Sequence, residues 1–99
     1  MNIQALMKQA QAMQKNILKS KKEIDEKVYE GTSELVSVTM NGKREILSVN
    51  IKKENNLDSD DIEILEDMIK IAFTMALEKI EKDISAKLGT QTGSLGNLL

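Results

Sequence analysis

Hydrophobic residues recur with a helical period along the first quarter of the chain. Good helix formers run from about Ile3 to Lys27 without a glycine or a proline, which predicts one long helix. At about 1.5 Å per residue it is roughly 37 Å long. Because this is more than a small sheet requires, we expect part of the helix to project or to pack on a partner. Its apolar side carries Ile3, Leu6, Ala10, Met13, Ile17 and Ile24.

The middle of the chain has the pattern of antiparallel strands. Apolar and polar residues alternate from Leu35 to Met40, and Asn41-Gly42 then suits a two-residue type I′ turn, in which both residues have positive φ. A further short strand is compatible with Val28 to Thr32. We therefore expect an antiparallel sheet of two or three strands. Lys43 to Lys52 supplies the returning strand, with Leu47, Val49 and Ile51 on one face.

A second long helix follows a polar connection. Asp58, Ser59 or Asp60 can cap its start, and Gly89 is expected to end it. Its apolar residues form two stripes, and one small sheet can cover only one of them. The other needs the first helix or another subunit, so we expect a homodimer. The first stripe comprises Ile62, Leu65, Ile69, Ala72, Phe73, Ala76 and Ile80, and the second comprises Ile64, Met68, Ile71 and Met75.

The pattern as a whole predicts a single α+β domain. Ninety-nine residues with 40% hydrophobic content suffice for one core and not for two. The order is a long N-terminal helix, a short antiparallel sheet with an Asn-Gly hairpin, and a long C-terminal helix. We place the domain at residues 1–89. Residues 90–99 are small and polar up to two final leucines, and we expect a flexible C-terminal tail there.

Charge is divided unevenly along the chain. Residues 1–22 carry five lysines and no acid, and because the whole chain is net −2, residues 23–99 are net −7. Helical spacing puts four of the lysines on the side opposite the apolar one, which is how a helix could pack on one face and contact a polyanion with the other. A solvated helix face is the alternative interpretation. The four are Lys8, Lys15, Lys19 and Lys22.

Composition argues against several functional classes. Without cysteine or histidine the chain lacks a thiolate, the commonest metal ligand and the usual neutral-pH base. No nucleophile, base and phosphate-binding loop come together, so we expect no enzyme activity, no cofactor and no small-molecule substrate. Nothing approaches the roughly 18 apolar residues of a membrane span, and we expect a cytoplasmic protein with no membrane partner. Helix capping explains the one dense acidic cluster better than a metal site does, namely Asp58, Asp60, Asp61 and Glu63.

Several segments together resemble a known family. The matching segments are Met13-Gln14-Lys15 in the first helix, VSVTMNGK from Val36 to Lys43, LEDMI from Leu65 to Ile69, and Ala72-Phe73 with Ala76. In this order and spacing they are similar to the YbaB/EbfC family of bacterial nucleoid-associated proteins over nearly the whole chain. The resemblance implies an α–β–α subunit, paired through the sheets into a tweezer-like dimer, that binds DNA in the nucleoid with little sequence selectivity.

The family has no contact motif to transfer, so the lysine assignment rests on charge alone. Thr74 replaces a common asparagine, one glycine precedes Leu35 where a glycine-rich run is usual, and the tail lacks Pro-Gly elements. With this resemblance, Lys8, Lys15, Lys19 and Lys22 are predicted to contact DNA. Lys43 and Arg44 are better explained as a solubilising turn. The alternative function is a prefoldin-like helix–hairpin–helix chaperone or assembly module, although Ser20 and Lys27 interrupt the heptads that such helices carry.

Overall fold

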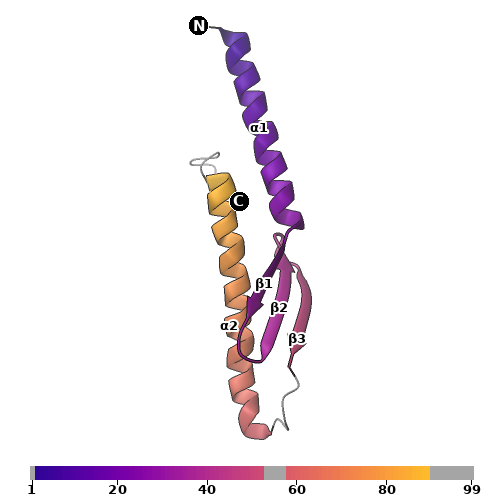
Figure 1. The fold of residues 1–99 in the computed structure, drawn as a ribbon. Coiled ribbons are helices and arrows are strands. Elements are labelled where there is room, and N and C mark those ends of the chain that lie inside the picture. The colour runs from indigo at the N-terminus through magenta and orange to yellow at the C-terminus, as the bar shows by residue number, and fades with distance from the viewer. Residues whose placement is uncertain (1, 53–57, 90–99) are drawn as a thin grey trace.

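The chain folds into two long helices and a three-stranded antiparallel sheet of order β1-β2-β3 (Figure 1). The computed structural model describes residues 2–52 and 58–89. This confirms the α+β class and the optional third strand, while the tail at residues 90–99 lies outside the described residues. In chain order the elements are α1 (Ile3–Glu26), β1 (Val28–Thr32), β2 (Val36–Asn41), β3 (Ile46–Ile51), α2 (Ser59–Ile84) and a short π-helix, η1 (Ser85–Gly89).

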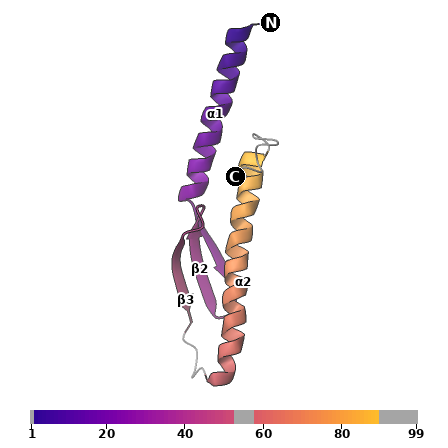
Figure 2. The ribbon, with the colours of Figure 1, turned by 180° about the vertical axis from the view of Figure 1, so that it is seen from behind.

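The molecule is elongated, with extents of 72 × 20 × 15 Å. Helix α2 lies along the sheet, whereas α1 continues beyond it, as the front and back views both show (Figure 1, Figure 2). The Asn2 side chain caps α1 by accepting from the backbone N–H groups of Gln4 and Ala5. Residues 2–16 are all exposed, and α1 joins the core only from Ile17 onward. Most of α1 is therefore a projecting arm.

The core lies between α2 and the first two strands. Gly31 allows the closest approach, because a Cβ built there would lie 1.8 Å from the Ala72 carbonyl oxygen. The first predicted stripe of α2 faces this core, except that Ile62 at its start is 55% exposed. Ile62 is exposed because it lies in the first turn of α2, ahead of the buried positions. The buried hydrophobic residues are Ile24, Tyr29, Val36, Val38, Met40, Ala72, Ala76, Ile80 and Leu88.

The hairpin between β2 and β3 differs from the predicted two-residue type I′ turn. The Arg44 N–H donates to the Asn41 carbonyl, and Arg44, with φ of 65°, is the non-glycine residue in the left-handed region among those described. The Asn41 side chain accepts from the Lys43 and Glu45 N–H groups, which stabilises this longer turn. Gly42 serves a different purpose from the one expected: a Cβ there would lie 2.0 Å from the Ile24 carbonyl oxygen.

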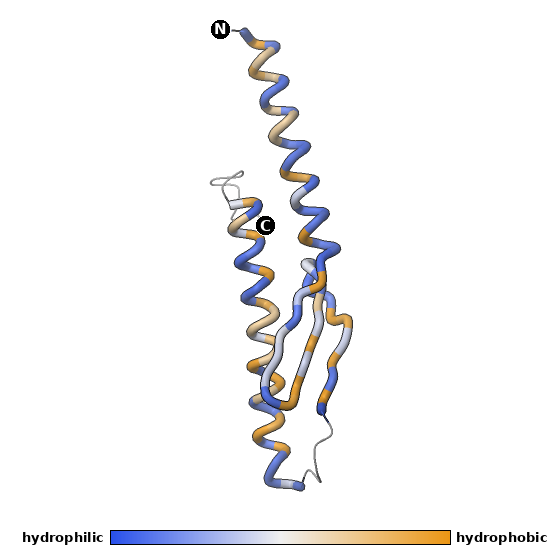
Figure 3. Tube along the Cα trace, viewed as in Figure 1, coloured by the Kyte–Doolittle hydropathy of each residue, from blue (hydrophilic) through white to orange (hydrophobic). Residues whose placement is uncertain are grey.

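Strand β3 is exposed along its whole length. Leu47, Val49 and Ile51, which were expected on one apolar face, are 52%, 50% and 40% exposed in the single chain. Helix α2 covers β1 and β2 and does not reach β3. A register shift after Thr39, which pairs with Ser48, also takes Leu47 out of simple alternation. Figure 3 shows hydrophobic positions on this outer strand.

Helix α2 starts where the acids predicted. Asp58 is the N-cap and forms a capping box with Asp61: its side chain accepts from the Asp60 and Asp61 N–H groups, and its own N–H donates to the Asp61 carboxylate. In the second stripe of α2, Ile64 and Ile71 are 53% and 54% exposed, whereas Met68 packs against the core and Met75 Sδ accepts from the Thr32 N–H of β1. Within residues 2–52 and 58–89, none of the helices is long and apolar enough to cross a membrane.

Candidate nucleic-acid interface

Four lysines form a row along the projecting part of α1. Their spacing of seven, four and three residues keeps them on one side of the helix over about 21 Å. All are exposed, and within the described ranges none is paired with an acid or donates a hydrogen bond from its side chain. The row therefore presents uncompensated positive charge to solvent. It consists of the predicted residues Lys8, Lys15, Lys19 and Lys22, and we call it the lysine row.

Charge changes sign where α1 meets the sheet. Glu23, Asp25 and Glu26 follow the lysines directly, and Asp25 pairs with Lys21 at 3.2 Å. Lys21 belongs to the apolar side of α1 and is thus neutralised locally, apart from the lysine row. Ile24 in this segment is 2% exposed and anchors the helix. The projecting part of α1 is therefore basic, and the end that packs on the core is acidic.

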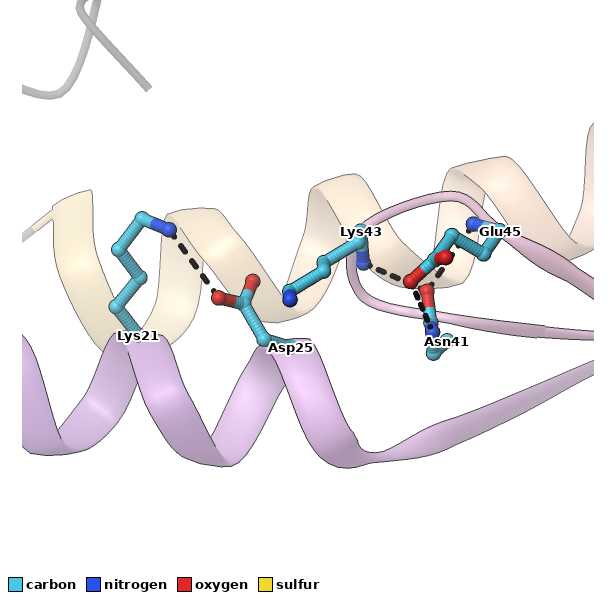
Figure 4. Close-up of polar contacts among 5 residues, drawn as sticks. All are labelled: Lys21, Asp25, Asn41, Lys43 and Glu45. Carbon is cyan, nitrogen blue, oxygen red and sulfur yellow. Dashed lines mark hydrogen bonds and ion pairs between the residues drawn. The ribbon is translucent and has the colours of Figure 1, made fainter.

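The hairpin turn carries a second group of basic side chains, and Figure 4 shows Lys43 on this turn with Lys21 and Asp25 on the neighbouring end of α1. Lys43 and Arg44 are exposed and line a hollow of about 330 Å³ together with Lys21 and Asp25. The turn contacts the apolar side of α1, whereas the lysine row lies on the opposite side. The structure therefore does not bring Lys43 and Arg44 together with the predicted DNA contacts.

A polar cluster at the edge of the core joins β1 to the end of α2, and no pattern in the sequence pointed to it. The Asp83 carboxylate accepts from the Tyr29 hydroxyl at 2.6 Å and from Lys27 Nζ at 3.1 Å, and Lys87 Nζ lies 3.5 Å away. The Tyr29 hydrogen bond, followed by the two lysines, lowers the pKa of Asp83. Burial, then the bond to Asp83, raises the pKa of Tyr29. Lys27 also lies 5.2 Å from the Tyr29 ring centroid.

This cluster fastens α2 to β1 and is not a candidate ligand site. It borders a hollow of about 630 Å³ whose cations include Lys27, Lys79 and Lys82. Lys27 is engaged by Asp83, and Lys79 Nζ donates to the Glu30 carbonyl at 2.7 Å. Two of the three charges are thus used within the fold. Within the described parts of the chain, no group of three or more acidic side chains is arranged to hold a metal ion.

Comparisons with known proteins identify the family of this chain. Residues 1–95 match the model of the YbaB/EbfC DNA-binding family. A "Nucleoid-associated protein" of Lachnoclostridium phytofermentans is 45% identical over 98 residues, covering 97% of this chain and 82% of the relative. Proteins of the same name from Pelotomaculum thermopropionicum and Enterococcus faecalis are 41% and 40% identical, covering 95% and 92% of this chain and 90% and 88% of those relatives. The chain belongs to the YbaB/EbfC DNA-binding family.

Proposed function

We propose that this protein is a homodimeric nucleoid-associated protein that binds DNA phosphates through the lysine row. The observation that carries the proposal is the exposure of Lys8, Lys15, Lys19 and Lys22 on the free arm, without an acid to neutralise them. Four lysines per subunit, doubled in a dimer, match about four to eight phosphates, enough for salt-sensitive binding near the non-specific range of about 10⁻⁴ to 10⁻⁶ M.

Low sequence selectivity follows from the chemistry of these side chains. Lysine is a point charge and lacks the planar fork with which arginine recognises guanine. Arg44 is the single arginine in the sequence, and it lies on the other side of α1 from the lysine row. We therefore infer a role in nucleoid organisation or gene regulation in the cytoplasm, in the absence of catalysis, a cofactor, a small-molecule substrate or a membrane partner.

The homodimer is proposed to form along β3. This edge strand is exposed at every position and carries Ile46, Leu47, Val49 and Ile51. An exposed apolar edge is a template for pairing with another strand. Pairing with β3 of a second copy would join the two sheets and bring these side chains into contact with their counterparts on the neighbouring strand. A two-fold axis would then place two lysine rows on one particle.

The test replaces all four lysines of the lysine row by glutamine. Glutamine is nearly as good a helix former and the apolar side is untouched, so α1 should persist. DNA affinity should fall to a similar degree on unrelated duplexes, and the slope of log K against log salt should flatten by about 0.9 for each phosphate that is no longer neutralised. Fluorescence anisotropy across a salt series measures both quantities, and circular dichroism checks the fold.

A pair of double variants supplies the matched control. K15Q/K19Q and K70Q/K82Q remove the same charge from α1 and from α2, and all four side chains are exposed. Only the α1 pair should weaken binding. Equal losses would show that net charge alone matters, and unchanged affinity in the quadruple variant would reduce the lysine row to a solvated surface. Capture of unfolded proteins that survives high salt would instead favour the prefoldin-like alternative.

A further inference from the structure

The Asn41-Gly42 pair at the hairpin turn is chemically reactive as well as tightly held. Among the asparagines of the sequence, Asn41 is the one that a glycine follows, whereas the others precede isoleucine, leucine or asparagine. Glycine has no side chain to keep its backbone nitrogen away from the preceding asparagine amide. Asn41 is therefore the asparagine of this chain that can react most readily with its own backbone.

The reaction open to this pair is deamidation through a cyclic imide. The Gly42 backbone nitrogen attacks Asn41 Cγ, so that a new N–Cγ bond forms and the Cγ–Nδ2 bond breaks. Nδ2 leaves as ammonia and takes up the proton that the Gly42 N–H loses. Water then opens the ring at either of its carbonyl carbons, which yields aspartate or isoaspartate. The whole reaction consumes water and releases ammonia, and it needs no oxidant, metal or cofactor.

Hydrogen bonds of the folded turn hold Asn41 in place. Its Oδ1 atom accepts from the Lys43 and Glu45 N–H groups, both at 3.0 Å, and its Nδ2 atom donates to Glu45 Oε1 at 3.0 Å (Figure 4). Its backbone is also paired, since the Asn41 N–H donates to the Glu45 carbonyl and the Asn41 carbonyl accepts from the Arg44 N–H. Ring closure requires Cγ to move onto the Gly42 nitrogen, and that movement would break several of these bonds.

The C-terminal end of α1 holds the other reactant, Gly42. This residue is buried, and a Cβ built on it would lie 2.0 Å from the Ile24 carbonyl oxygen and 2.4 Å from the carbonyl carbon. Backbone thus lies directly against backbone. The Gly42 N–H must lose its proton to water or hydroxide before it can attack, and burial keeps both away until the turn opens locally.

We propose that Asn41-Gly42 is a deamidation site that the contact with Ile24 protects. Asn41 reacts when the hairpin separates from α1 and is stable while the two are in contact. Asparagine deamidation is irreversible under these conditions, so each modified chain records one opening of the hairpin. The proposal concerns the attachment of α1 to the sheet; it goes beyond the proposed DNA binding and can succeed or fail independently of it.

The products fit the closed turn less well than asparagine does. Isoaspartate adds a methylene group to the main chain just before Gly42, where there is no room beside Ile24. Both products also replace the amide that donates to Glu45 with a carboxylate, which repels the Glu45 side chain. The hairpin therefore cannot regain its full contact with Ile24, and we expect the end of α1 to remain loosened.

The first experiment measures deamidation in the full-length protein at mildly alkaline pH, with and without urea. Mass spectrometry of proteolytic peptides follows each asparagine. In urea, Asn41 should react faster than any other asparagine, and in the folded protein its reaction should be slower by about tenfold or more. Equal rates with and without urea would show that the fold gives no protection. A rate in urea no higher than at the other asparagines would remove the site.

Two glutamate variants at different turns test the hydrogen bonds. E45A removes the acceptor for Asn41 Nδ2, whereas E34A makes the same change at an exposed position between β1 and β2. Deamidation of folded E45A should be about threefold faster or more, and E34A should react as the unmodified protein does. Slower deamidation in E45A would mean that Glu45 promotes the reaction, and equal acceleration in both variants would deny a specific role to the bond. Either result would overturn the protection that we propose.

Hydrogen exchange tests the consequence for α1. The modified protein carries an additional negative charge and can be isolated by anion exchange. Backbone amides in residues 20–26 should exchange faster by about tenfold or more after modification, while those in residues 72–80 of α2 should be unchanged. Unchanged exchange in α1, or an equal increase in both helices, would contradict a local loosening of α1.

Discussion

The two edge strands of the sheet, β1 and β3, differ in how far the rest of the chain covers them. Along β1, Lys79 Nζ donates to the Glu30 carbonyl, and the Thr32 N–H donates to Met75 Sδ at 3.5 Å. Both bonds come from α2, which crosses this edge. Along β3, by contrast, no side chain among the described residues is bonded to the strand's backbone, and all six residues are exposed.

This difference indicates on which side the sheet can grow. An open edge is a hazard that proteins block with charges, helices or irregular geometry, and β1 has both a helix and a lysine. Strand β3 has apolar side chains instead, among them Val49 at 50% and Ile51 at 40% exposure. Protection of one edge and exposure of the other favour a single pairing mode, through β3.

The largest effect is expected from a comparison of two residues that are paired on neighbouring strands. Val38 and Val49 are register partners on β2 and β3, but Val38 is 0% exposed and Val49 is 50% exposed. V38D should unfold the chain, because an unpaired buried charge costs several kcal/mol, comparable with the whole stability of a small domain. V49D should yield a folded monomer. Thermal circular dichroism and light scattering distinguish the outcomes, and a dimeric V49D would show that β3 is not the interface.

The next test separates α2 from β1. In Gly31→Ala the new Cβ would meet the Ala72 carbonyl oxygen at 1.8 Å and the Ala76 nitrogen at 2.8 Å, so α2 must move off the strand. We expect a loss of about 1–3 kcal/mol in the free energy of unfolding. Gly89→Ala is the matched control, since its Cβ would meet nothing within 4 Å. Urea titration measures both variants, and equal stability of the two would disprove the close contact.

A smaller effect is expected from the bond between Tyr29 and Asp83. Tyr29→Phe should lower the free energy of unfolding by about 0.5–1.5 kcal/mol at neutral pH. The lowered pKa of Asp83 means that its contribution is present above its ordinary pKa of 3.8 and is lost as pH falls below it. The raised pKa of Tyr29 means that its contribution is lost as pH rises above 10. Urea titrations across pH should show that the free energy of unfolding depends less on pH in both ranges for the variant than for the unmodified protein. An equal pH dependence in the two proteins would argue against the bond.

The smallest effect on stability is expected from the lysine that donates a hydrogen bond to the backbone of β1. Lys79→Gln removes the donor to the Glu30 carbonyl from an exposed site, and we expect a loss of roughly 0.5 kcal/mol. Lys82→Gln should change the free energy of unfolding by less, because the Lys82 side chain bonds to none of the described residues. A larger loss in the Lys82 variant would reverse this assignment.

Local patterns predict the elements well because local physics decides them. The Asp58 cap, the α1 boundaries and the core stripe of α2 follow from capping and periodicity. The predicted hairpin turn is wrong because the Asn41 side chain binds two backbone N–H groups and because Gly42 is required by contact with Ile24. That contact depends on tertiary packing, which a dipeptide preference does not contain.

Contacts between residues far apart in the chain could not be predicted from the sequence for a related reason. Tyr29 and Asp83 are 54 positions apart, and neither stands in a recognisable motif. Covering of strand faces also depends on which strands α2 reaches, so the alternation on β3 indicates an apolar face without showing what covers it. The position of the lysine row could be predicted because it depends only on helical spacing, and its side chains are exposed as expected. Its contact with DNA stays a prediction.

The contact between Gly42 and Ile24 fixes α1 at its C-terminal end, next to the sheet, while the rest of the helix projects. Backbone meets backbone there, and an added Cβ would lie 2.0 Å from the Ile24 carbonyl oxygen, so the helix has little play at its root. From Ile24 to Ile3 the arm is about 32 Å long, and a rotation of about 5° at the root moves the tip by about 3 Å. A small adjustment at the hairpin turn would thus be magnified at the Ile3 end of α1.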